Sequence, residues 1–199
     1  MEAILDRPDR HQAALFDTSW QKLMMWIFII GDALLFGTFL PCYGWQRIAG
    51  EAWPDRTHVF HMNFITAMTF TLITSSATMA TAVGAARKGD LANAGRFVWL
   101  TVLGGLVFLG CQAYEWAGLI HQGARMNTNP WGPAAFSAYF FMITGFHGTH
   151  VLIGVIILAI TAIRSSMRKA TAEGVELAGL YWHFVDLVWV FVFGCFYLI

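Results

Sequence analysis

The chain has 199 residues, of which 57% are hydrophobic and 12% are charged, about half the ~25% charged share of typical soluble domains. This balance excludes an ordinary soluble domain. Lys plus Arg and Asp plus Glu each number 12, so the net charge is zero and no basic field exists that would bind nucleic acid. Disorder is excluded because long apolar runs accompany 17 Phe and 9 Trp, whereas disordered chains combine low hydrophobicity with high net charge. The composition therefore indicates an integral membrane protein.

A polar segment, residues 1–22, precedes the first apolar run. It lacks the basic start and short apolar core of a signal peptide, so we expect it to be retained as a cytoplasmic N-terminal segment. Five apolar runs follow, each near the roughly 20 helical residues that span a bilayer core of about 30 Å. They predict an all-α, five-helix transmembrane domain over residues 23–199, with helices at 23–43, 62–86, 97–120, 136–163 and 181–199.

The basic residues predict which way the helices face, because positive charge is retained on the cytoplasmic side of a membrane. The N-terminal segment and the loops after the second and fourth helices contain Arg7, Arg10, Lys22, Arg87, Lys88, Arg96, Arg164, Arg168 and Lys169. The opposite side has only Arg47, Arg56 and Arg125. With an odd number of helices, this asymmetry predicts a cytoplasmic N-terminus and a C-terminus outside.

Six ionisable side chains lie inside the predicted helices, where each acid costs about 2.5 to 3.5 kcal/mol on insertion scales if it stays unpaired. They are Asp32, Glu115, His147, His150, His183 and Asp186. Counting 1.5 Å per residue from the cytoplasmic helix ends predicts two levels. At the outer level we expect a hydrogen bond between Glu115 and one of the two neighbouring rings, His147 or His150. At the inner level we expect a group of the two aspartates and His183.

Three interpretations of these polar groups stay open. The first is structural, in which polar pairs fix which helices pack together. The second is a haem or metal site, but His147 and His150 share one helix and His183 is far shallower, which argues against a bis-histidine haem. A metal pair bridged by carboxylates needs about four acids with Glu-x-x-His motifs. This chain has only three intramembrane acids, and they lie at three different depths. The third is proton handling, because carboxyl and imidazole groups in apolar surroundings can hold or pass protons.

Three longer strings place these residues in motifs: QAYEW at 112–116, GFHGTHVLIG at 145–154 and YWHFVDLVW at 181–189. Together they resemble subunit III of the haem-copper oxidases, the terminal respiratory oxidases, and the likeness covers the chain from the first predicted helix onward. The family motifs also fall on Gln112 and Trp182. The buried carboxylate of the family falls on Asp32, where cytochrome c oxidases usually have Glu.

The resemblance implies a helical bundle without a redox centre in a bacterial plasma membrane. It implies that the chain packs against oxidase subunit I, which holds the haem and copper, in a complex with subunit II and other subunits. In the family, subunit III helps proton delivery to subunit I and protects the active site from inactivation. No cofactor is then expected on this chain, although phospholipid can bind its surface. Five helices resemble the short bacterial form, which should lack the lipid cleft of the seven-helix members.

The strings look closer to cytochrome c oxidases than to quinol oxidases, so cytochrome c is the expected electron donor of the complex. Three alternatives stay open: subunit III of a quinol oxidase, the subunit III-like partner of a nitric oxide reductase, and a free-standing haem or metal membrane protein.

Overall fold

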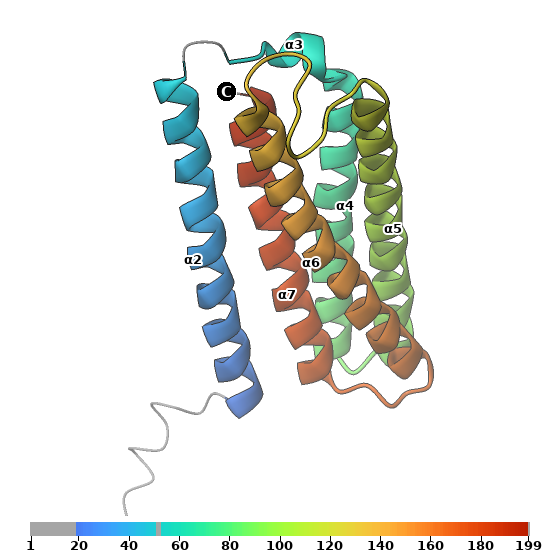
Figure 1. Cartoon of the computed structure of the whole chain (residues 1–199). Helices are drawn as coiled ribbons and strands as arrows, with labels where there is room; N and C mark the ends of the chain where they lie inside the picture. Colours follow the sequence, from blue (N-terminus) through green and yellow to red (C-terminus); the bar gives the residue numbers. More distant parts are fainter. Residues whose placement is uncertain (1–18, 51–52, 199) are drawn as a thin grey trace, which may run out of the picture.

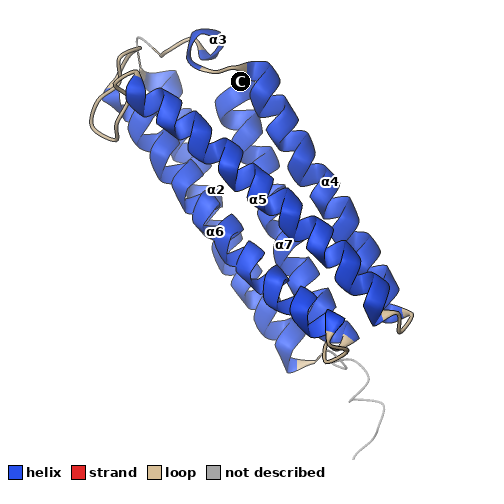
Figure 2. Cartoon of the chain, turned by 90° about the vertical axis from the view of Figure 1, so that its right-hand side faces the viewer, coloured by secondary structure: helices blue, strands red, loops and turns tan. Residues whose placement is uncertain are grey.

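The computed structural model describes residues 19–50 and 53–198, and this part of the chain forms a bundle of long helices (Figure 1). The five long helices are α2 (Trp20–Ala49), α4 (Met62–Arg87), α5 (Leu91–His121), α6 (Ala134–Ser166) and α7 (Ala172–Phe193). A short helix, α3 (Arg56–Val59), precedes α4, and a π-helical turn, η2 (Gly194–Leu198), continues α7. Loops lie at the two ends of the bundle (Figure 2).

The prediction of five membrane-spanning helices is confirmed, since all five are long and apolar enough to cross a bilayer. The predicted bounds differ most for the last helix, which begins at Ala172 instead of residue 181. Two glutamates near its start interrupt the apolar run, but Thr171 caps the helix by accepting a hydrogen bond from the Gly174 amide at 3.0 Å. Of the expected N-terminal segment, residues 1–18 lie outside the described residues, and α2 already begins at Trp20.

Helices α4 to α7 pack together, and α2 lies at one side of this group, mainly against α7 and to a smaller extent against α6 (Figure 1). Only three residues of α2 are buried, namely Asp32, Phe36 and Tyr43. Most of its remaining surface is apolar and exposed, which suits contact with lipid or with another membrane protein. Few contacts therefore decide where α2 sits.

Trp182 of α7 occupies the junction where α4, α5, α6 and α7 meet. Its indole nitrogen donates a hydrogen bond to Ser75 Oγ of α4 at 3.1 Å, and its ring lies against two glycines. A Cβ atom on Gly105 of α5 would come within 2.7 Å of the ring, and one on Gly154 of α6 within 3.0 Å. Small residues let transmembrane helices approach closely, so this motif tryptophan has a clear structural role.

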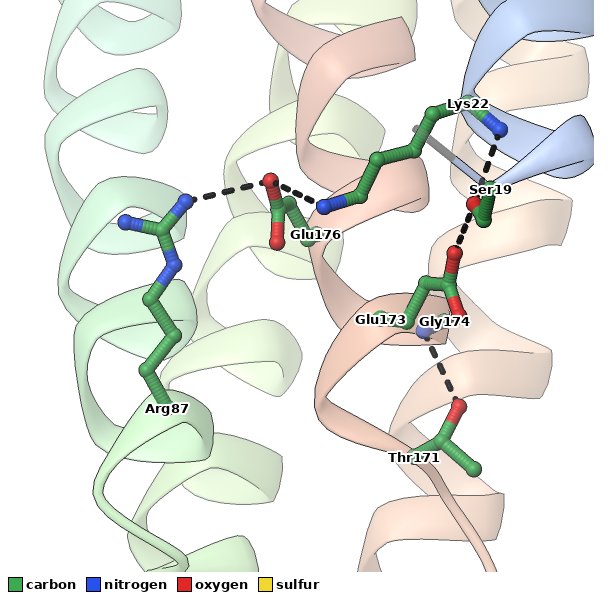
Figure 3. A network of polar contacts seen from close by, with 7 residues as sticks. All are labelled: Ser19, Lys22, Arg87, Thr171, Glu173, Gly174 and Glu176. Carbon is green, nitrogen blue, oxygen red and sulfur yellow. Dashed lines mark hydrogen bonds and ion pairs between the residues drawn. The ribbon is translucent and has the colours of Figure 1, made fainter. Parts of the chain in front are cut away.

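At the N-terminal end of α2, ion pairs join three helices (Figure 3). Glu176 of α7 lies 3.2 Å from Lys22 Nζ of α2 and 3.1 Å from Arg87 of α4. Ser19, the N-cap of α2, donates to Glu173 of α7. The same end of the bundle carries the turn between α4 and α5 and the turn between α6 and α7, both of which are basic (Figure 1). That this basic end faces the cytoplasm stays a prediction.

We predict that Gly105→Leu destabilises the bundle, because the added side chain must displace Trp182 or Val155. Overpacking of this kind costs about 1–3 kcal/mol. Thermal unfolding of the purified chain in mild detergent would show a lower midpoint. Gly110→Leu is the matched control, since a Cβ atom on Gly110 of the same helix meets nothing within 4 Å. Equal midpoints for the two variants would contradict this role of the glycine.

Candidate functional site

The central polar contact joins Asp32 of α2 to His150 of α6. Asp32 Oδ2 lies 2.9 Å from His150 Nε2, and both residues are only 8% exposed. On the other side of the ring, His150 Nδ1 lies 2.9 Å from the Phe146 carbonyl oxygen. Phe36 and Phe146 pack against the imidazole, with ring centroids at 5.8 and 4.7 Å. The contact is therefore enclosed by aromatic rings.

The geometry of His150 limits where protons can sit. A carbonyl oxygen can only accept, so Nδ1 must donate its hydrogen to Phe146. A neutral ring with Nδ1 protonated presents a bare Nε2 to the Asp32 oxygen. Asp32 Oδ2 makes no hydrogen bond among the described residues, so its 2.9 Å contact with Nε2 is an ion pair when a further proton makes the ring cationic. The Asp32–His150 pair can thus hold one shared proton.

The expected group of Asp32 with His183 and Asp186 is wrong, because Asp32 pairs with His150 instead. Counting along helices had placed Asp32 and His150 at depths that differ by about 6 Å. The count carried no information on the rotation of each helix about its axis. In the structure Asp32 faces α6, and the two residues on α7 face elsewhere.

Glu115 of α5 also has a different partner from the one expected. The Tyr197 hydroxyl, from η2 at the end of the chain, donates to the Glu115 carboxylate, with oxygen distances of 3.2 and 3.3 Å. The predicted hydrogen bond to His147 or His150 is therefore wrong. A hydrogen bond from α5 to α6 comes instead from Gln112, whose Nε2 donates to the Thr144 carbonyl at 2.7 Å.

His147 is completely buried, and neither of its ring nitrogens has a hydrogen-bond partner among the described residues. Its ring lies between two aromatic residues, with centroids 5.8 Å from Phe108 and 5.1 Å from Trp189. His147 therefore packs as an aromatic ring within the bundle.

The remaining polar group lies between α7 and α4. His183 Nδ1 is 2.6 Å from the Ser76 hydroxyl. Asp186, one turn further along α7, is 8% exposed. Sequence reasoning missed Ser76 here, as it missed Tyr197 beside Glu115. The one available signal for Ser76 was the large number of Ser and Thr residues in α4, which small-residue packing also explains.

The three intramembrane histidines do not converge on one point. His147 lies among aromatic rings, His150 contacts α2, and His183 contacts α4. Within the described ranges, no three His, Cys, Asp or Glu side chains gather into a group that could hold a metal ion. In the described structure, these three histidines are therefore not arranged as the two axial ligands of one haem. That the chain binds no cofactor at all stays a prediction.

Comparison with known proteins places nearly the whole chain in one family. Residues 10–199 match the family model described as cytochrome c oxidase subunit III. Quinol oxidase subunit 3 of Bacillus subtilis (strain 168) is 37% identical over 183 residues, which cover 88% of this chain and 85% of that protein. Cytochrome c oxidase subunit 3 of Alkalihalophilus pseudofirmus is 32% identical over 194 residues, with 96% and 92% coverage. Cytochrome c oxidase subunit 3 of Bacillus sp. (strain PS3) is 32% identical, with 88% and 84% coverage. These matches confirm the resemblance seen in the motifs, and the chain belongs to the subunit III family of the haem-copper oxidases.

Proposed function

We propose that this chain is subunit III of a proton-translocating terminal oxidase in a bacterial plasma membrane. Its partners are then subunit I, which it contacts directly, subunit II and the other subunits of the complex. Family membership over nearly the whole chain supports this assignment, as do relatives that are named subunits of such oxidases. The basic end of the bundle, with the N-terminus, faces the cytoplasm by the positive-inside rule, and the C-terminus lies outside.

The chain supports proton uptake by the complex and carries no redox centre of its own. Haem and copper belong to the partner subunits. The observation that supports the proton-handling role is the 2.9 Å contact between Asp32 and His150, because a carboxyl group and an imidazole this close can hold a proton between them. The contact lies under α2, which of the five long helices has the smallest buried share, so most of the α2 surface is left for a neighbouring subunit.

We propose cytochrome c as the electron donor, on the strength of the QAYEW, GFHGTH and YWHFVD strings. A quinol donor is the second candidate, and the 37% identical quinol oxidase subunit of Bacillus subtilis favours it. The electron donor binds elsewhere in the complex. The role proposed for the residues of this chain is therefore the same with either donor.

Purification of the tagged chain from its host in mild detergent tests the assignment. We expect large partner chains to co-purify, with haem bands in the reduced-minus-oxidised spectrum and oxygen consumption with reduced cytochrome c. Oxygen consumption with quinol alone would select the second candidate. Nitric oxide reductase subunits in the preparation would contradict the assignment, and pigment retained by the isolated chain would contradict the absence of a redox centre.

We predict that Asp32→Ala shortens the working life of the oxidase several-fold while it changes the initial rate less, because the shared proton is lost. We expect Asp186→Ala to act in the same direction, and Asp32→Glu to restore function because it keeps the carboxyl group. The measurements are proton uptake in vesicles and the number of turnovers before inactivation. Asp90→Ser is the control, since Asp90 caps α5 through the Asn93 amide at 3.1 Å and Ser caps helices as well. Unchanged turnover numbers and proton uptake in both alanine variants would reject the proposal.

A further inference from the structure

Three of the long helices, α4, α5 and α6, end in the same backbone turn. In each turn one residue has a left-handed conformation: Gly89 with φ 81°, Gly123 with φ 95° and Arg168 with φ 54°. The amide of that residue donates to the carbonyl three residues earlier, and the next amide donates to the carbonyl five residues earlier. Glycine adopts this conformation without strain, whereas a residue with a Cβ atom adopts it at a cost in free energy. Arg168 is the one non-glycine residue with such a positive φ in the described part of the chain.

The charge of the turn between α6 and α7 does not account for an arginine at this position. Basic residues near a helix C-terminus interact favourably with the helix dipole, and basic loops set the orientation of a membrane protein. Both effects depend on the number of charges in the turn. Met167, the preceding residue, is 56% exposed and has an unstrained φ of −83°. An arginine at position 167 followed by a glycine would supply the same charge without strain.

The basic side chains of this turn have no ion-pair partner among the described residues. Arg164, Arg168 and Lys169 are exposed, and the ion pairs of the described side chains do not include them. Glu173 and Glu176, the acids that follow the turn in sequence, contact side chains of α4 and of the start of α2 instead (Figure 3). The turn therefore attracts an anionic group from outside the chain.

We infer that Arg168 binds a carboxylate on an acidic surface segment of a partner subunit, with Met167 packed against the same partner. The inference rests on the proposed function, which supplies the partner. Arginine and methionine are enriched in protein interfaces, and a guanidinium group can hold a carboxylate by two parallel hydrogen bonds.

The strained position favours a protein over the anionic lipid of the membrane surface. A carboxylate in a folded partner is fixed in space, so it requires the guanidinium group at one particular position. Lipid headgroups respond to the basic charge of a segment near the membrane surface, and an arginine at position 167 would attract them as well.

The test measures how firmly the complex retains this chain. The tagged chain is purified with its identified oxidase subunits from the native host and diluted in mild detergent. Native mass spectrometry then gives the concentration at which half of the complex keeps the chain. We expect Arg168→Gly to raise this concentration about tenfold, and Arg168→Asn to act in the same way, since Asn also tolerates the left-handed conformation. The thermal midpoint of the purified Arg168→Gly chain should not fall, because glycine adopts the turn without strain.

Two control variants separate the position of the charge from its amount. Lys88→Gln removes one exposed charge from the other basic turn and should leave retention within about twofold of the unmodified chain. Met167→Arg combined with Arg168→Gly keeps the net charge of the turn but moves it by one residue. This double variant should retain the chain no better than Arg168→Gly alone.

Unchanged retention in Arg168→Gly and Arg168→Asn would overturn the inference. Full retention in the double variant would also overturn it, because only the number of charges would then matter, as for anionic lipid. An equal loss in Lys88→Gln would have the same meaning. These results leave the proposed function intact. If no oxidase subunit accompanied even the unmodified chain, the proposed function would be contradicted and the inference with it.

Discussion

The contact between Asp32 and His150 determines how α2 sits on the bundle. Helices in lipid gain little from the hydrophobic effect between them, so polar and closely packed contacts decide their arrangement. Asp32 is one of only three buried residues of α2. The other helices share a broad packed core. Helix α2 is held at its basic end by Lys22 and at its middle by Asp32. Near its other end, the ring centroid of Tyr43 lies 4.1 Å from that of Phe196. A contact between a carboxyl group and an imidazole therefore lies at the centre of the helix with the smallest buried share.

Some motif residues hold the helices together, and others place carboxyl groups at the boundaries of the bundle. Trp182 joins four helices at one junction, and Gln112 ties α5 to the backbone of α6. These are positions where a change would disturb packing. Asp32 and Glu115 instead lie at boundaries of the bundle, Asp32 between α2 and α6 and Glu115 beside a pocket between α4 and α5. Under the proposed function, the Asp32 carboxyl group takes part in proton handling.

Hydropathy and length were enough to predict five helices, because each must cover a fixed bilayer thickness. The predicted start of α7 was wrong because Glu173 and Glu176 interrupt the apolar run. The residues of α2 and α4 that pair with these glutamates can be identified only in the folded chain. The candidate residues were found because ionisable groups in apolar runs are conspicuous. Their pairing was wrong because depth along a helix does not fix its rotation. Tyr197 was missed because it lies in an apolar terminal run.

The most direct test of the shared proton is ¹⁵N nuclear magnetic resonance of labelled histidine in the membrane-embedded chain, with the His150 signals assigned by their loss in His150→Gln. We predict a protonated Nδ1 and, at Nε2, a hydrogen bond to Asp32 that disappears in Asp32→Ala. A neutral ring protonated only at Nε2, with Nδ1 bare, would contradict the shared proton.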